Sequence, residues 1–146
     1  MALKLDMSKA YDRVEWSFLE ATMVKMGFNE KWVALVISCI NSASYSILVI
    51  GVPKGDIRPT RGIRQGDPLS PYLFLICFEV LNCQLQQEAK SKAIRSFSLC
   101  KNGPKITHLF FPDDTLLFFR ATMSDLDVIQ HILSLYEQAS GQKLNR

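Results

Sequence analysis

Three aspartates stand where folding could bring their carboxylates together. Asp6 ends a short N-terminal segment of alternating character, and Asp113 and Asp114 follow an apolar segment and Pro112. Clustered carboxylates repel one another, so such a cluster is costly unless a cation neutralises it. Carboxylate oxygens suit Mg²⁺, and two such ions can clamp an in-line phosphoryl displacement. Taken alone, Pro112-Asp113-Asp114 is also ordinary turn chemistry, and Asp6 alone is an ordinary strand-end acid.

The strands predicted around these aspartates would position them. Residues 1–6 form a predicted strand, and the apolar segments 106–111 and 115–119 predict a hairpin, with a tight turn between them. If segment 1–6 pairs antiparallel with segment 115–119, Asp6 lies beside the hairpin turn. All three carboxylates then meet at one edge of the sheet.

The remaining elements are predicted from apolar periodicity, caps and breakers. The expected helices are 15–26 before Gly27, 30–40 after the cap residue Asn29, 70–88 with Ser70 as N-cap and Pro71 at N1, and 123–139 after a Thr122–Asp125 capping box and before Gly141. The other expected strands are 45–50, 56–58 and 96–99. This order predicts an α+β fold, a small antiparallel sheet with helices packed on one face.

A basic, glycine-containing loop precedes the third predicted helix. Gly62 and Gly66 would let the backbone approach a ligand closely. Arg61 and Arg64 suit phosphate and nucleic-acid contacts, and Gln65 can hydrogen-bond a base or sugar. A basic loop on its own is more often solvated surface, and the Gly-Lys-Ser/Thr pattern of a Walker-type loop is absent from the sequence.

Composition narrows the class of protein. The 146 residues are 48% hydrophobic and 10% aromatic, which excludes a wholly disordered chain. The net charge of +3 permits a nucleic-acid partner without requiring one. The sequence has neither a membrane-length apolar run nor a secretory signal, so we expect an intracellular protein without a membrane partner. Its four cysteines lack metal-type spacing and are expected to be structural, in a reducing compartment.

Four motifs carry a family resemblance. Residues 4–14 (KLDMSKAYDRV) resemble the first palm motif of the reverse transcriptases of non-LTR (LINE-type) retrotransposons. Residues 61–74 (RGIRQGDPLSPYLF) resemble the second motif, 111–114 (FPDD) the Phe-Ala-Asp-Asp turn, and 140–145 (SGQKLN) the motif that follows. The order and spacing of the four motifs match those of the family across almost the whole chain, and their amino-acid sequences most resemble those of plant elements. The resemblance implies a polymerase palm and RNA-directed DNA polymerase activity.

The resemblance also implies catalytic roles. Asp6 and Asp113 would hold two Mg²⁺ ions, or Mn²⁺ in their place, and Asp114 would support them as a third metal ligand. Lys143 would approach the leaving pyrophosphate as a proton donor; a lysine near a helix C-terminus is also favourable without any function. The reaction would be attack of a primer 3′-hydroxyl on the α-phosphate of a deoxynucleoside triphosphate.

Substrate contacts are implied at other positions of the same motifs. Tyr11 would lie under the incoming sugar and exclude a 2′-hydroxyl, although a tyrosine there is also a plausible core residue. Gln65 and Gly66 would touch the nascent base pair and the template, while Arg61 and Arg64 would contact phosphates. The implied partners are an RNA template, a DNA primer and deoxynucleoside triphosphates.

Three interpretations of the whole chain remain open at this point. We expect residues 1–146 to be a partial reverse transcriptase domain, with fingers, thumb and endonuclease regions belonging to a longer parent protein that acts in the nucleus, the cytoplasm or both. The chain is then the palm of a working polymerase or an inactive, truncated remnant. Pro112, in place of the family's alanine, favours inactivity of this chain alone. The third interpretation is a non-catalytic nucleic-acid-binding domain that uses the patch 58–64.

Overall fold

The computed structural model describes residues 1–98, 100, 103–111 and 114–145. The elements, in chain order, are β1 (Ala2–Asp6), α1 (Trp16–Lys25), α2 (Glu30–Asn41), β2 (Tyr45–Val49), β3 (Val52–Ile57), α3 (Ser70–Lys90), β4 (Phe97–Ser98), β5 (Lys105–Ile106), β6 (His108–Phe110), β7 (Asp114–Phe118) and α4 (Met123–Ser140). The predicted α+β class is confirmed.

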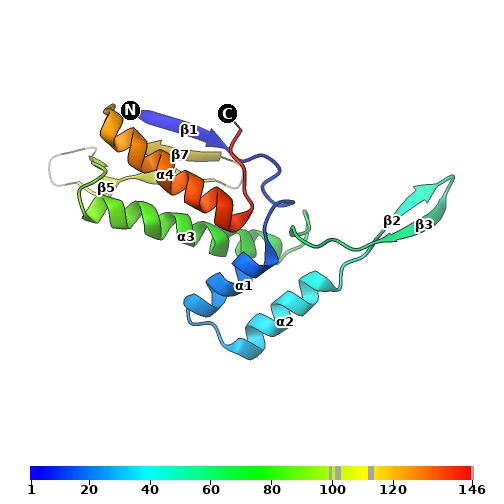
Figure 1. Ribbon diagram of the computed structural model, residues 1–146. Coiled ribbons are helices and arrows are strands. Elements are labelled where there is room, and N and C mark those ends of the chain that lie inside the picture. Colours follow the sequence, from blue (N-terminus) through cyan, green and yellow to red (C-terminus); the bar gives the residue numbers. More distant parts are fainter. Residues whose placement is uncertain (99, 101–102, 112–113, 146) are drawn as a thin grey trace.

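The central sheet has the antiparallel strand order β1-β7-β6. In its register Leu5 lies opposite Thr115 and Asp6 lies opposite Asp114, which confirms the predicted pairing of the first strand with the outgoing strand of the hairpin. Helices α3 and α4 cover one face of this sheet (Figure 1). The other face is open along β1 and β7, on the side where Lys4 and Asp6 are exposed.

The core lies between this sheet and its helices. Leu5, Thr115 and Leu117 are buried because alternate strand residues point toward α3 and α4. Leu81 and Cys77 of α3 are fully buried. Cys77 therefore packs as a small hydrophobic residue, as predicted, and its burial raises the pKa of the thiol to about 12.

The observed helix cap agrees with the sequence-based prediction in α4 and differs from it in α3. The Thr122 hydroxyl accepts a hydrogen bond from the Asp125 backbone N–H and donates one to the Asp125 carboxylate, at 3.3 and 2.7 Å, which confirms Thr122 as the N-cap and Asp125 as its partner. The reciprocal bond of a capping box is replaced, because the Thr122 N–H donates to the Arg120 carbonyl at 2.9 Å. The prediction that Ser70 is the N-cap of α3 is wrong, because Leu69 holds that position. Asp67 accepts from the Leu69 N–H at 2.8 Å and so caps the helix from outside it.

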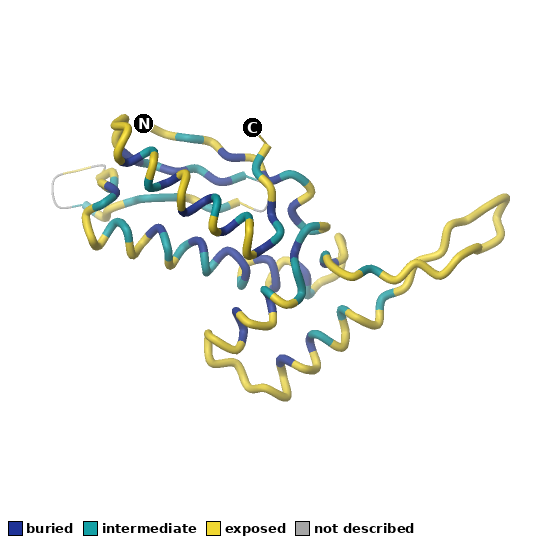
Figure 2. The backbone as a smooth tube through the Cα atoms, viewed as in Figure 1, coloured by how far each residue is buried: buried dark blue, intermediate teal, exposed yellow. Residues whose placement is uncertain are grey.

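A two-stranded hairpin, β2–β3, projects from the body beyond α2 (Figure 1). The second strand was predicted at 56–58 and instead spans Val52–Ile57, because the turn at Ile50 and Gly51 comes earlier. A proline and a glycine are tolerated inside β3 because this ribbon consists only of edge strands. Every residue of both strands is exposed (Figure 2), so we call β2–β3 the arm.

The described residues between 96 and 111 form two short β-ladders where longer strands were expected. Phe97–Ser98 pairs with Lys105–Ile106, and His108–Phe110 pairs with β7. The predicted strand 106–111 is therefore divided at Thr107, between two partners. None of the helices in the described part of the chain combines the length and apolar character needed to cross a bilayer.

Candidate functional site

Two carboxylates meet at one end of the central sheet. Asp6 and Asp114 are direct antiparallel partners, so their side chains point to the same open face. Lys4, two residues before Asp6 on that face, places its Nζ 2.9 Å from the Asp114 carboxylate. This hydrogen bond and the charge of Asp114, with a smaller contribution from Asp6, raise the pKa of Lys4. Lys4 thus offsets part of the repulsion between the two acids. Asp113 and Pro112 lie outside the described residues.

The C-terminal segment closes over Asp6. Leu144 forms an antiparallel bridge with Met7, and the Lys143 carbonyl accepts a hydrogen bond from the Ser8 N–H at 2.8 Å. Asn145 contacts Asp6 twice: its backbone N–H donates to the Asp6 carbonyl at 2.9 Å, and its side-chain amide donates to the Asp6 carboxylate at 2.5 Å. The first and fourth motifs therefore form one site. The predicted Lys143 side chain is exposed beside it.

Gln142 fastens this segment to the turn after β1. It is 1% exposed, and its side-chain amide donates to the Ala10 carbonyl at 2.7 Å. Gly141 ends α4 with φ = 76°, and a Cβ there would lie 2.6 Å from the Arg13 carbonyl oxygen. Neither Gln142 nor Asn145 was predicted as a site residue. Their motif had been recognised, but a sequence pattern does not show which loop a glutamine or asparagine will contact.

The loop of the second motif is anchored to the same turn. The Gly62 N–H donates to the Val14 carbonyl at 2.8 Å, and the Gly62 carbonyl accepts from the Trp16 indole N–H at 2.7 Å. A Cβ on Gly62 would lie 2.8 Å from the Asp12 carbonyl oxygen. Gly62 is therefore required for the close approach of this loop to the chain itself, and it also lines the cavity described next, so its approach to a ligand stays a prediction. Gly66, with φ = 86°, faces open space.

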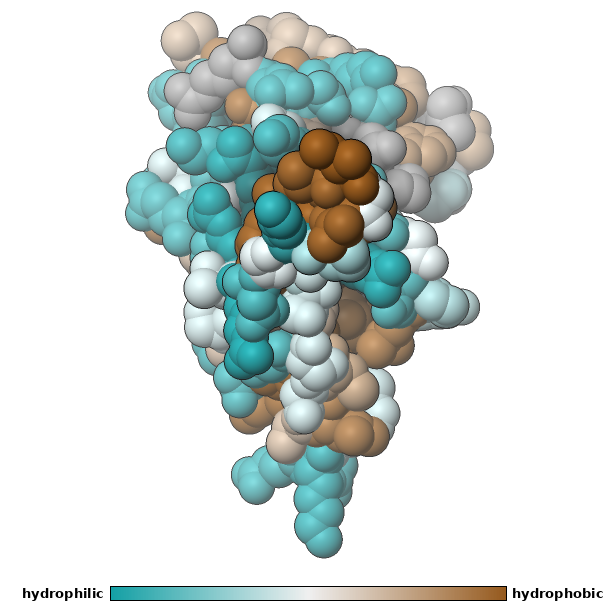
Figure 3. All heavy atoms as spheres, turned by 90° about the vertical axis from the view of Figure 1, so that its right-hand side faces the viewer, coloured by the Kyte–Doolittle hydropathy of each residue, from teal (hydrophilic) through white to brown (hydrophobic). Residues whose placement is uncertain are grey.

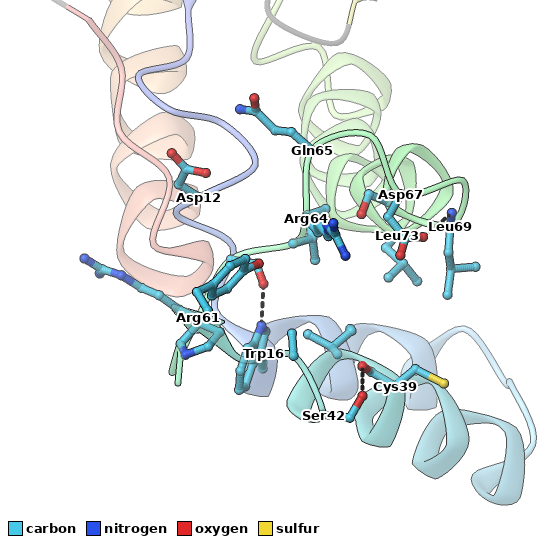
Figure 4. A pocket seen from close by; sticks show the side chains of 17 residues that line it. Asp12, Trp16, Cys39, Ser42, Arg61, Arg64, Gln65, Asp67, Leu69 and Leu73 are labelled. Atoms are coloured by element: carbon cyan, nitrogen blue, oxygen red, sulfur yellow. Dashed lines mark hydrogen bonds between the residues drawn. The ribbon is translucent and has the colours of Figure 1, made fainter. Parts of the chain in front are cut away.

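The three polar side chains predicted in this loop line a cavity of about 680 Å³. Arg64 lies near its centre, with Gln65 and Asp12 at one rim (Figure 4). Arg61 also lines it and forms an exposed ion pair with Glu15 at 3.4 Å. Among the described residues no carboxylate is paired with Arg64. Its positive charge is therefore available in a concave site.

Tyr11 joins the turn after β1 to the loop of the second motif and to α3. Its ring is half-buried and stacks on Phe74 of α3, with ring centroids 4.8 Å apart and planes at 17°. The Tyr11 carbonyl accepts from the Ile63 N–H at 2.9 Å. The ring thus has a packing role, as the alternative interpretation expected, and one part of it reaches the surface.

The described residues hold only part of the predicted metal cluster. They contain no group of three or more His, Cys, Asp or Glu side chains placed to hold a metal ion. Asp6 and Asp114 are brought together, while Arg61, Arg64, Gln65 and Gly66 belong to the neighbouring loop. These placements agree with the arrangement of the sequence motifs, and the roles of the residues remain predictions.

Comparison with known proteins identifies the family. A model of the reverse transcriptase (RNA-dependent DNA polymerase) family matches residues 1–146. The chain belongs to the reverse transcriptase family. The Pol polyprotein of a type-1 retrotransposable element R2 from Popillia japonica is 31% identical over 145 residues, which is 98% of this chain. An uncharacterized mitochondrial protein of Arabidopsis thaliana is 44% identical over 72 residues, or 49% of the chain. The predicted resemblance to non-LTR retrotransposon reverse transcriptases is confirmed.

The fold of this reverse transcriptase domain also occurs in a solved structure. Apo telomerase from Candida tropicalis, truncated from its C-terminal domain, matches 97% of the chain with a TM-score of 0.68 at 18% identity. The chain spans 28% of that structure, 22% of the R2 polyprotein and 59% of the Arabidopsis protein. It therefore corresponds to one portion of longer proteins.

Proposed function

We infer that this chain is the palm portion of an RNA-directed DNA polymerase and provides the site of nucleotidyl transfer. The observation that carries the proposal is the direct pairing of Asp6 with Asp114 on an open face of the sheet. Two like charges placed opposite each other destabilise a sheet unless something compensates them. Lys4 forms its ion pair with Asp114 and acts less strongly on Asp6, whose carboxylate accepts a hydrogen bond from the neutral amide of Asn145. A cation-binding role accounts for the arrangement.

The donor set fits Mg²⁺. Asp6 is exposed and Asp114 is part-exposed, and both offer the hard carboxylate oxygens that Mg²⁺ prefers. We propose that these two residues, with Asp113 adjacent in the sequence, hold the metal. When bound, the metal would neutralise phosphate charge and activate the primer hydroxyl.

The other residues of the site would position substrates. Asn145 holds the Asp6 carboxylate by its amide and so fixes the direction of its second oxygen. Arg64 and Gln65 line the neighbouring cavity, where a cation and an amide suit the phosphates and bases of a template strand. The exposed part of Tyr11 would support the incoming sugar, and Lys143 would donate a proton to the leaving pyrophosphate. RNA template, DNA primer and deoxynucleoside triphosphates are the substrates of this proposal.

Metal binding is the direct test. In NMR spectra of the chain, a Mn²⁺ titration should broaden the amide signals of residues near Asp6 and Asp114 before others, because a bound paramagnetic ion relaxes nearby nuclei. Asp6→Asn should abolish this broadening because it removes one of the two placed carboxylates. Asp127→Asn is the matched control, since Asp127 is an exposed acid of α4.

Three outcomes would contradict the proposal. If Asp6→Asn and Asp127→Asn bind Mn²⁺ equally, the carboxylate pair is not a metal site. If the wild-type chain binds RNA but shows no localised Mn²⁺ broadening, the non-catalytic nucleic-acid-binding interpretation replaces the polymerase. A chain that is folded yet binds neither metal nor RNA would be the inactive remnant.

A further inference from the structure

A second cavity lies at the other end of the sheet from Asp6 and Asp114. It has a volume of about 580 Å³ and is lined by residues from the C-terminal end of α3 and from strands β5 and β6. His108, which lines it, pairs with Leu117, three residues along β7 from Asp114. That separation is roughly 10 Å at the usual strand rise, and β5 lies farther still. The cavity is therefore distinct from the carboxylate site.

Three exposed lysines line this cavity: Lys90, Lys92 and Lys105. No aspartate or glutamate is among its lining residues, and within the described residues none of the three lysines forms an ion pair. The sequence strengthens the bias, because no acid occurs between Glu88 and Asp113, a stretch with five lysines and arginines. Glu88 itself is half-buried and accepts a hydrogen bond from the Ser91 hydroxyl.

Lys92 occupies a left-handed backbone position, at which a glycine would have less conformational strain. It follows the C-cap residue Ser91 of α3 and has φ = 65°. Glycine is the usual residue at this left-handed position, since a side chain there costs roughly 1 kcal/mol. A lysine at this turn is therefore not explained by backbone preference. It does add a third charge to the cavity.

The remaining polar groups of the cavity are neutral. The side chains of Thr107 and His108 hydrogen-bond to each other at 2.8 Å, and the His108 ring stacks on Phe110. Burial lowers the pKa of His108, against a smaller opposing effect of Glu79, and so favours the uncharged ring. Gln86 and Ser96 add an amide and a hydroxyl. The site thus combines lysine charges with neutral hydrogen-bonding groups.

We propose that this lysine cavity binds the phosphate backbone of a nucleic-acid strand. Lysines act as point charges, which attract phosphates without reading sequence. The absence of acids from the lining favours a polyanion. A strand held here would lie at the opposite end of the sheet from the carboxylate pair. The inference does not depend on the proposed catalytic function, because it uses neither aspartate.

Salt-dependent RNA binding tests the inference. Fluorescence anisotropy of a labelled single-stranded oligouridylate would be measured against the 146-residue chain, in EDTA so that metal sites do not contribute. Lys90→Gln/Lys105→Gln is compared with Lys25→Gln/Lys31→Gln, which removes the same charge elsewhere. Lys25 and Lys90 are matched because each is the basic residue in the last turn of its helix.

The expected result is a weaker salt dependence of RNA affinity in the Lys90→Gln/Lys105→Gln variant alone. Each lysine that neutralises a phosphate of a single strand contributes about 0.7 to the slope of log affinity against log salt. Losing two should lower the slope by about 1.4, so a rise from about 50 to about 200 mM NaCl would cost about sevenfold less affinity than in the wild type. Equal effects of the two pairs would overturn the site in favour of diffuse charge, and no effect of either would also overturn it.

Lys92→Gly separates binding from folding. It removes a charge while supplying the residue that the left-handed turn prefers, so thermal stability should hold or rise. RNA affinity at low salt should nevertheless fall. Unchanged affinity in this variant would contradict a role for Lys92. Displacement of the RNA by a poly-glutamate peptide of equal charge, as efficient as by unlabelled RNA, would contradict a nucleic-acid site.

Discussion

The central sheet and the arm are both antiparallel and both rich in apolar side chains, yet only the sheet has a packed face. In β1 and β7, alternate residues such as Leu5 and Leu117 are buried under α3 and α4. In the arm, Leu48 is 69% exposed and Ile50 is 98% exposed. Strand formation and burial are therefore separate properties in this chain, and a run of apolar and β-branched residues indicates only the first.

The arm carries an apolar surface. Its exposed large hydrophobic residues are Tyr45, Ile47, Leu48, Val49, Ile50, Val52 and Ile57. Figure 3 looks toward this side of the molecule and shows an apolar cluster at its nearest point. A two-stranded hairpin is marginal by itself in water. The body should therefore unfold as one cooperative unit, while the arm opens locally at a lower free energy.

The largest expected difference in the free energy of unfolding is between alanine substitutions of two leucines, one in the body and one in the arm. Leu81→Ala should destabilise the body by about 2–5 kcal/mol, because it removes a fully buried side chain and leaves a cavity. Leu48→Ala in the arm should change the free energy of unfolding by less than about 0.5 kcal/mol. Urea unfolding followed by circular dichroism measures both. Comparable losses in the two variants would show that the arm is part of the cooperative core.

The next contrast lies in the loop that joins the arm to the body. Gly62 and Gly66 both have φ = 86°, so an alanine at either should cost roughly 1–2 kcal/mol from backbone strain. Only at Gly62 would the new Cβ also meet backbone, 2.8 Å from the Asp12 carbonyl oxygen. Gly62→Ala should therefore lower the melting temperature further than Gly66→Ala. Equal shifts would mean that the anchor between this loop and the turn after β1 is loose.

A smaller difference in stability is expected between asparagine substitutions of two aspartates, and this difference depends on pH. In the body, the hydrogen bond from Thr122, with help from the backbone N–H groups of Arg95 and Arg120, holds the pKa of Asp125 below its usual 3.8. In the arm, Asp56 forms an exposed ion pair with Arg58. Asp125→Asn should cost about 1 kcal/mol at neutral pH, the usual size of a capping interaction. Asp56→Asn should cost almost nothing.

The sign of the pH effect follows from linkage. Because the folded state lowers the pKa of Asp125, its contribution is present above the unfolded value near 3.8 and is lost as the pH falls through the folded value. Melting temperatures of the wild type and Asp125→Asn should therefore converge below about pH 4. A gap that stays constant down to pH 2 would show that the carboxylate charge contributes nothing.

Local sequence patterns predicted the helices and strands, whereas contacts between residues distant in sequence determined how the loops of the site are held. The strand segments of β1 and β7 and the Thr122 cap followed from residue types and spacing, because those signals lie within a few residues, whereas the pairing of the two strands was a hypothesis about contacts distant in sequence. The anchoring of Gly62 by Val14 and the contact of Asn145 with Asp6 join residues 48 and 139 positions apart. No local rule encodes such contacts, although each lies in a motif that had been recognised.

The exposure of the arm was beyond local prediction for a related reason. Segment 45–50 was predicted as a strand from its β-branched residues, and β2 is a strand. Whether its side chains are buried depends on which element packs against it. In the described residues, the partner of β2 is β3 alone. Burial is thus a property of tertiary partners, which the residue types of one segment do not specify.

The smallest expected effect is a gain confined to the tip of the arm. Ile50 has φ = 52° and precedes Gly51 at φ = 75°, the pair of positive angles that a tight hairpin turn favours and that a β-branched residue resists. Ile50→Asn creates the Asn-Gly turn and, because Ile50 is 98% exposed, removes no packing. Hydrogen exchange at Val49 and Val52 should slow several-fold, a local gain of up to about 1 kcal/mol. The melting temperature of the body should stay unchanged. A rise of the global melting temperature would show instead that the turn stabilises the whole molecule, and that the arm and the body unfold together.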